Sequence, residues 1–129
     1  MQKLLFVMNP FAGQKRANKY LAEIIGVFNQ AGFEVTAHMT AGPGDAAALV
    51  ERRAGDFDLV VCAGGDGTLN ETVTGLRRSG ADCPVGYIPC GSTNDFAATL
   101  KLSTDVLQAA KDIVEGTDQY YDLGVFNGR

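Results

Sequence analysis

A glycine-rich turn between an apolar run and a helical pattern constrains the fold of this chain more than any other feature. Residues 57–63 form a short apolar run rich in β-forming side chains, which predicts a buried strand. Leu69, Val73 and Leu76 then recur at helical spacing, which predicts a helix with one apolar face. The sequence Gly-Gly-Asp-Gly-Thr at 64–68 therefore lies on a strand-to-helix turn.

The same alternation of strand and helix patterns runs through the rest of the chain. Strand patterns occupy 3–8, 33–39, 57–63, 85–88 and 118–126. Helical patterns occupy 17–28, 46–54, 69–76, 96–100 and 106–114, and Asp45 suits the start of the second. Such alternation implies right-handed βαβ units. The predicted fold class is α/β, one domain over 1–129 with a three-layer, Rossmann-like parallel sheet and helices on both faces.

Composition excludes several functional classes. A net charge of −4 provides no basic footprint for nucleic acid. No apolar run reaches the ~18 residues that a membrane-spanning helix needs. The chain begins directly with a strand-like run, unlike a signal peptide.

The cysteines and the histidine carry weak signals. Cys62, Cys83 and Cys90 are odd in number and contain no CxxC pair, so we expect reduced, structural thiols in a cytoplasmic protein. His38, the only histidine, lies in a strand-like run, where a metal or catalytic role is not expected.

The turn at 64–68 has the composition of a phosphate site. Glycines let a ligand approach the main chain closely, and the N–H groups and dipole at a helix start attract anions. Thr68 adds a hydroxyl donor. A carboxylate at Asp66 would repel phosphate unless Mg²⁺ lies between them, an arrangement typical of that ion. The alternative is a glycine-rich connection in which Asp66 serves as a local helix cap.

A second loop, at 89–95, offers similar chemistry. Gly91 permits close approach of a ligand, Ser92 and Thr93 supply hydroxyls, Asn94 an amide and Asp95 a carboxylate. In parallel sheets the ligand lies beyond the carboxyl ends of the strands, where this loop and those at 9, 40 and 64 should gather. The alternative is an Asx-rich turn that caps the next helix.

The ordered set of motifs resembles the diacylglycerol kinase catalytic-domain superfamily, which includes bacterial lipid kinases and sphingosine kinases. The resemblance covers essentially the whole chain. It is carried by Asn9-Pro10, Gly13, Thr40, Gly44-Asp45-Ala46, the run 64–71, Pro89, Gly91, Asn94-Asp95-Phe96-Ala97 and Asp122-Leu123-Gly124. The Gly-Gly-Asp-Gly-Thr element alone is shared with NAD kinases and phosphofructokinases, whose N-terminal domains the expected fold resembles.

This resemblance implies an ATP- and Mg²⁺-dependent lipid kinase of phospholipid metabolism. It implies catalytic roles for Asp66 and Asp95, with Asp66 also on the metal. The implied nucleotide-binding residues are Asn9, Lys15, Thr40, Gly64, Gly65, Asp66, Gly67, Thr68, Leu69, Asn70, Glu71, Gly91, Ser92, Thr93 and Asn94. Lys15 is chosen because Gln14 stands where relatives often have lysine, and Ser92 likewise departs from the usual threonine.

Family members carry a C-terminal β-rich domain that helps form the lipid cleft and supplies the general base. This chain ends at Arg129 after a hairpin-like Asn127-Gly128, so we expect it to be the front, ATP-binding part of a longer protein and inactive alone. The expected partners are ATP and a lipid such as diacylglycerol. The expected location is the cytoplasm, with peripheral contact at the inner face of the membrane as an option.

The residues are also compatible with two other functions. A kinase of a soluble acceptor, as in NAD kinases, would use the same first loop. A non-catalytic nucleotide-binding module would also keep it. A dinucleotide oxidoreductase is disfavoured because no Gly-x-Gly-x-x-Gly follows the first strand.

Overall fold

The computed structural model describes residues 2–9, 20–89 and 107–115, and its centre is a four-stranded parallel sheet. The strands are β1 (Gln2–Met8), β2 (Phe33–Met39), β3 (Leu59–Gly64) and β4 (Val85–Pro89). Their order in the sheet is β2-β1-β3-β4, so β2 lies on one side of β1, and β3 and then β4 lie on the other.

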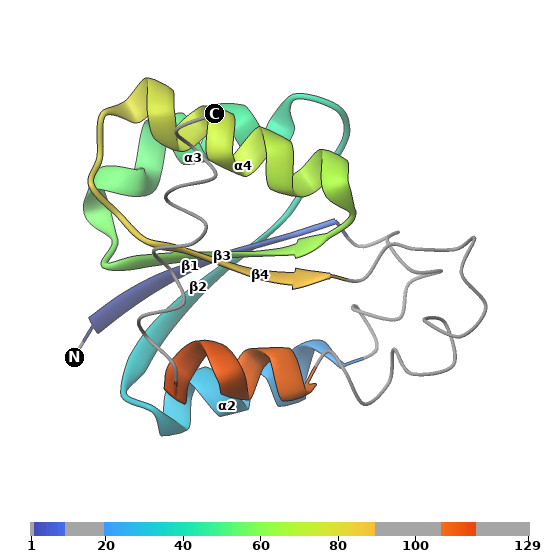
Figure 1. Cartoon of the computed structure of the whole chain (residues 1–129), viewed down its shortest axis with the longest axis vertical. Coiled ribbons are helices and arrows are strands. Elements are labelled where there is room, and N and C mark those ends of the chain that lie inside the picture. Colours follow the sequence, from blue (N-terminus) through green and yellow to red (C-terminus); the bar gives the residue numbers. More distant parts are fainter. Residues whose placement is uncertain (1, 10–19, 90–106, 116–129) are drawn as a thin grey trace.

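Helices cover both faces of this sheet, which confirms the predicted three-layer α/β fold (Figure 1). One face carries α3 (Asp45–Arg53), the short 3-10 turn η2 (Ala54–Asp56) and α4 (Asp66–Ser79). The other face carries α2 (Leu21–Gln30) and a helix at 107–115. No helix within the described ranges combines the length and apolar character required to cross a bilayer.

The sheet is buried on both sides, which explains its almost continuous apolar strands. Leu4, Phe6 and Met8 of β1 belong to the core beneath α2, whereas Leu5 and Val7 belong to the core beneath α3 and α4. All six residues of β3 are buried. Alternation along each strand therefore divides the apolar side chains between two cores.

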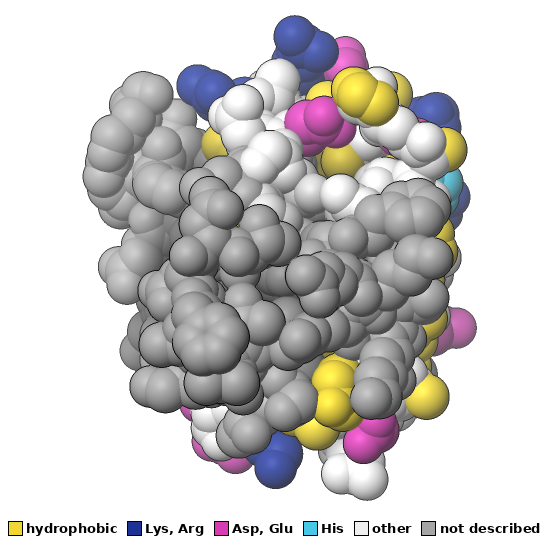
Figure 2. Space-filling view, turned by 90° about the vertical axis from the view of Figure 1, so that its right-hand side faces the viewer, with side chains coloured by type: hydrophobic (Ala, Val, Ile, Leu, Met, Phe, Trp, Pro, Cys, Tyr) yellow, Lys and Arg dark blue, Asp and Glu magenta, His cyan; other side chains and the backbone are white. Residues whose placement is uncertain are grey.

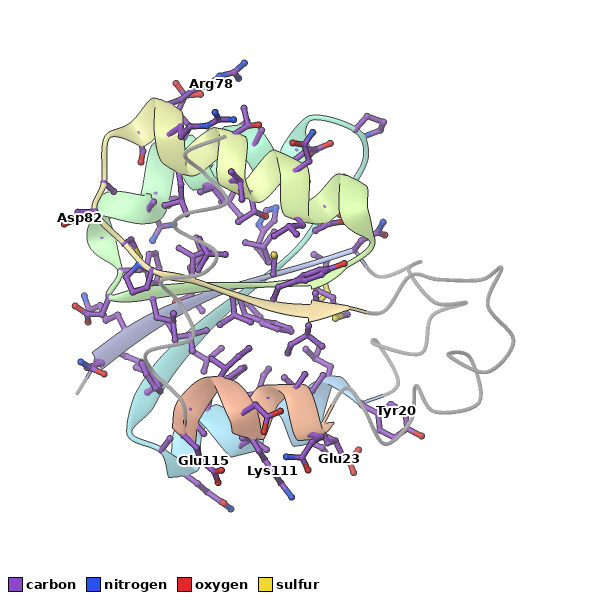
Figure 3. All side chains as sticks on the ribbon, in the orientation of Figure 1. Tyr20, Glu23, Arg78, Asp82, Lys111 and Glu115 are labelled. Atoms are coloured by element: carbon purple, nitrogen blue, oxygen red, sulfur yellow. The ribbon has the colours of Figure 1, made fainter. Side chains whose placement is uncertain are left out.

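Charged side chains mark the solvent side of the α2 layer. Glu23 of α2 and Lys111 and Glu115 of the helix at 107–115 point away from the sheet (Figure 3). On the inner side, Ile113 packs so closely on β4 that a Cβ added to Gly86 would lie 2.9 Å from Ile113 Cδ1. Ala110 and Ile113 are buried, as the helical spacing predicts.

The strand ends meet at one edge of the sheet. Met8 is in register with both Met39 and Ala63, and Gly64 is in register with Pro89. Just beyond β1, the Asn9 N–H donates to Ala63 O at 3.1 Å, and the Thr40 N–H donates to Met8 O at 2.8 Å. The loops that follow the strands therefore start side by side at this edge.

Most predicted boundaries agree with the structure to within two residues, and Asp45 is the first residue of α3, as predicted for a helix start. Gly44 holds the N-cap position with a left-handed φ of 86°, which favours glycine. The Asp45 carboxylate accepts a hydrogen bond from the Ala41 N–H of the preceding loop. The expected helix at 96–100 and strand at 118–126 lie outside the described residues.

Candidate functional site

The corner between β3 and α4 can be built only with glycine at its first position. Gly64 has φ of 158°, and a Cβ placed there would lie 2.6 Å from Thr68 Oγ1 and 2.9 Å from Thr68 Cβ. Gly65 follows as the N-cap of α4 in an extended conformation. The chain therefore turns sharply from the sheet edge into the helix.

The start of α4 presents main-chain donors. The Leu69 N–H donates to Gly65 O at 3.2 Å, which is the first bond of the helical pattern. The N–H groups of a helix's first turn, at 66–68 here, have no acceptor within the helix. Together with the helix dipole they create a partial positive charge that favours an anion.

This helix start opens into a hollow of about 330 Å³ at the carboxyl edge of the sheet. Three segments line it: the residue after β1, the loop after β2, and the first turns of α4. The lining residues are Asn9, Thr40, Ala41, Gly42, Pro43, Ala46, Gly67, Thr68 and Glu71. Amide, hydroxyl and small side chains thus predominate in its wall.

Figure 2 faces the edge at which the strands of Figure 1 end. Above the residues drawn in grey, white surface (backbone and uncharged side chains) is mixed with hydrophobic side chains in yellow and charged side chains in dark blue and magenta.

The loop between β2 and α3 is held by two carboxylates. Glu71 Oε2 accepts a hydrogen bond from the Gly44 N–H at 3.0 Å, across 27 residues of sequence. Asp45 Oδ2 accepts from the Ala41 N–H at 2.7 Å and lies 3.4 Å from His38 Nε2. The Ala41 hydrogen bond, helped by His38, lowers the pKa of Asp45 below its ordinary value.

Tyr87 supports the glycine corner from the neighbouring strand. Its hydroxyl donates to Gly64 O at 3.3 Å, from a half-buried position on β4. The bond fixes the carbonyl just before the turn, and because a trans peptide is planar it also fixes the direction of the Gly65 N–H.

The structure brings together five of the predicted nucleotide-binding residues. Asn9, Thr40, Gly67, Thr68 and Glu71 all line the hollow. They come from three separate segments of the chain, as the expected gathering of loops at one sheet edge requires.

The remaining predicted residues of the first loop have different places. Gly64 and Gly65 form the corner itself, and Asn70 is exposed on α4. The side chain of Leu69 is 8% exposed and packs in the core, so this residue helps to position the helix start. Asp66 begins α4, but its side chain is outside the described part.

Several predictions fall on residues that the structure does not describe. They concern Lys15, Gly91, Ser92, Thr93, Asn94 and Asp95. Their placement in the site stays a prediction.

Sequence reasoning missed part of the wall. Ala41, Gly42, Pro43 and Ala46 line the hollow but were not named as site residues. A Gly-Pro-Gly loop directly after a strand was a usable signal, because such loops let a ligand approach the main chain. No comparable signal existed for Tyr87, whose bond to the corner depends on which strands are neighbours.

The described side chains of the site do not by themselves form a metal-binding cluster. Within the described ranges, no three His, Cys, Asp or Glu side chains come together in a way that could hold an ion. Mg²⁺ commonly binds through one or two carboxylates, waters and phosphate oxygens, so it needs no such cluster. A magnesium ion that arrives with a phosphate ligand is therefore compatible with the described part of the site.

Comparison with known proteins provides an independent view. A family model described as "Diacylglycerol kinase catalytic domain" matches residues 3–126. A diacylglycerol kinase of Bacillus subtilis (strain 168) is 40% identical over 131 residues, which is 100% of this chain and 43% of that protein. A diacylglycerol kinase of Staphylococcus carnosus (strain TM300) is 38% identical over 125 residues, or 95% of this chain and 40% of that protein.

A solved structure agrees with these sequence matches. A diacylglycerol kinase structure from Bacillus anthracis str. Sterne superposes with a TM-score of 0.73 at 33% identity, covering 89% of this chain and 42% of that one. The chain thus spans less than half the length of the relatives that it matches.

Proposed function

Because the chain belongs to the diacylglycerol kinase catalytic domain family, we propose that it is the ATP-binding part of a lipid kinase. The kinase would transfer the γ-phosphate of ATP to a lipid hydroxyl such as that of diacylglycerol. The observation that carries the proposal is the glycine corner at 64–65, which directs the start of α4 into a hollow lined by small residues, two threonines and an asparagine.

The hollow has the features that a triphosphate requires. The first-turn N–H groups of α4 offer donors and a partial positive charge. Gly67 is exposed, and nothing lies within 4 Å of the Cβ that it lacks, so a phosphate can come close to the main chain there. Thr40, after β2, and Thr68, in α4, both line the hollow and offer hydroxyls from two separate segments.

Phosphoryl transfer depends mainly on positioning and on charge neutralisation. Mg²⁺, when bound, would supply part of that neutralisation, and Asp66 is the residue of the first loop proposed to hold it. Lys15, the loop at 91–94 and Asp95 are proposed to complete the nucleotide site.

A general base is not evident in the described part of the hollow. Glu71 is the one ionisable side chain among its described lining residues, and its carboxylate already accepts the Gly44 amide. We therefore propose that the base for the acceptor hydroxyl lies outside this chain and that the chain alone has little or no kinase activity.

The binding part of the proposal is tested with a matched pair of glycines in the full-length protein. Gly67→Ala adds a methyl group inside the hollow, whereas Gly26→Ala adds one in α2 under the opposite face of the sheet, and both positions have room for it. Each change should stabilise its helix by up to about 1 kcal/mol. Loss of close main-chain contact should weaken Mg·ATP binding to the Gly67 variant by about tenfold or more.

Isothermal titration with Mg·ATP and thermal unfolding measure the two effects. Equal affinity of the Gly67 and Gly26 variants would contradict phosphate binding at this helix start. A wild-type protein with no saturable Mg·ATP binding would overturn the proposal altogether.

The acceptor is tested by assay of the full-length protein with ATP and Mg²⁺. We expect phosphate transfer to diacylglycerol in mixed micelles and none to NAD. Transfer to NAD alone would place the protein among soluble-acceptor kinases, and binding without transfer to either would favour a nucleotide-binding module.

A further inference from the structure

We infer that Glu71 is a positioning residue, which holds the loop at 41–44 against α4 and so keeps one wall of the nucleotide hollow in place. The inference rests on the proposed function for its effect on ATP, although the contact itself is independent of it. It replaces the expectation that Glu71 binds the nucleotide directly.

The first argument is the contact that Glu71 makes. Its Oε2 lies 3.0 Å from the Gly44 nitrogen. Gly44 is the N-cap of α3, and its own carbonyl accepts the Ala48 N–H at 3.1 Å. One glycine therefore links the side chain of α4 to the first turn of α3, so Glu71 joins the starts of the two helices that flank the hollow.

The second argument is charge. A carboxylate aimed at a triphosphate would repel it, whereas the start of a helix carries a partial positive charge. Glu71 Oε2 accepts the N–H of Gly44, which is the N-cap of α3, so this oxygen lies at the start of that helix. This arrangement lets a negative side chain lie in the wall of an anion site without serving as a ligand of the anion.

The third argument is the internal structure of the loop. The Asp45 carboxylate accepts the Ala41 N–H at 2.7 Å, and the Asp45 N–H donates to Gly42 O at 3.2 Å. These bonds tie the loop to Asp45, the first residue of α3, so that the loop and the start of α3 form one unit. The Glu71 bond ties that unit to α4.

Two variants separate a hydrogen-bonding role from a charge or metal role. Glu71→Gln keeps an acceptor oxygen at about the same reach and removes the charge. Glu71→Ala removes the acceptor. Glu51→Gln, on the exposed part of α3, is the control for loss of a carboxylate elsewhere on this helix pair.

The first readout is hydrogen exchange of the Gly44 amide, followed by NMR in the full-length protein without nucleotide. Glu71→Ala should accelerate that exchange by about tenfold, because a hydrogen bond to a charged acceptor is lost. In Glu71→Gln the exchange rate of the Gly44 amide should stay within about threefold of wild type, because a neutral acceptor still forms the bond, although a weaker one. Unchanged exchange in Glu71→Ala would overturn the inference.

The second readout is steady-state kinetics with varied ATP. Glu71→Ala should raise the KM for ATP by about tenfold and leave kcat within about threefold, and Glu71→Gln should restore most of the loss. A Gln variant as defective as the Ala variant, with the defect in kcat, would show a charge or metal role and overturn the inference. If wild-type protein binds no Mg·ATP, the proposed function fails, while the Gly44 exchange still decides whether Glu71 holds the loop.

Discussion

The two helices above the sheet, α3 and α4, meet in two places of opposite character. At Gly75 the contact is buried and lies directly on the main chain of α3, because an added Cβ would lie 2.6 Å from Ala47 O and 3.1 Å from Glu51 N. One helical turn earlier on the same side of α4, Glu71 needs its full side chain to reach the amide of Gly44. The gap between the helices therefore widens toward the hollow.

This difference separates stability from function within one helix pair. The Gly75 contact joins the helices where no ligand could enter. The Glu71 contact lies where the helices diverge, and there a polar bond takes the place of packing. Substitutions at the closed contact should change folding, and substitutions at the open end should change binding more than folding.

The largest effect on folding is expected from Gly75→Ala. The new methyl group would collide with main-chain atoms of α3, which cannot rotate away, so the helices must separate. We expect a loss of about 1–3 kcal/mol in the free energy of unfolding, despite the better helix propensity of alanine. Urea unfolding measures it, with Gly26→Ala as the control that should be neutral or stabilising. Equal stability of the two variants would contradict the closed contact.

Gly64→Ala tests the end of α4 that lies at the hollow, where the chain turns from β3 into the helix. Alanine at φ of 158° is strained, and its Cβ would displace Thr68, so we expect a loss of about 1–2 kcal/mol in stability. Displacement of Thr68 should also weaken Mg·ATP binding by the molecules that remain folded, whereas Gly75→Ala should leave their affinity nearly unchanged. A Gly64 variant that loses stability but binds Mg·ATP normally would contradict the idea that the end of this helix pair near the hollow serves binding and the Gly75 contact serves folding.

The smallest effect is expected from Asp45→Asn. The pKa of Asp45 is lowered in the folded state, mainly by the Ala41 N–H, so the ionised carboxylate stabilises the fold. That contribution is fully present above the unfolded pKa of about 3.9 and is lost as pH falls through the lower folded pKa.

Urea unfolding at several values between pH 7 and pH 2.5 measures this dependence. The stability difference between wild type and Asp45→Asn should be constant above about pH 5 and should shrink below about pH 4. Asp82→Asn is the control, on the side of the molecule away from the hollow (Figure 3). A difference that grows on acidification would show that Asp45 is not held as a carboxylate.

Much of the fold could be predicted because local patterns report burial directly. Strand β2 agrees with its predicted range, and Leu69, Val73 and Leu76 are buried as their spacing predicts. The glycine corner was predicted for a similar reason, because several glycines close together indicate a turn whose backbone conformation other residues do not readily adopt. Asp45 begins α3 as predicted, but its bond to the Ala41 N–H could not be predicted, because that bond depends on how the preceding loop folds back on the helix start.

The sequence by itself determined the parallel α/β architecture, the position of the glycine turn and the strand edge at which the loops gather. These follow from periodicity and from the limited conformations open to each residue type. Only the tertiary structure decided that Glu71 meets Gly44 and that Tyr87 meets Gly64. Both bonds join residues more than 20 positions apart, and the packing of α4 on α3 and the pairing of β3 with β4 bring their partners together.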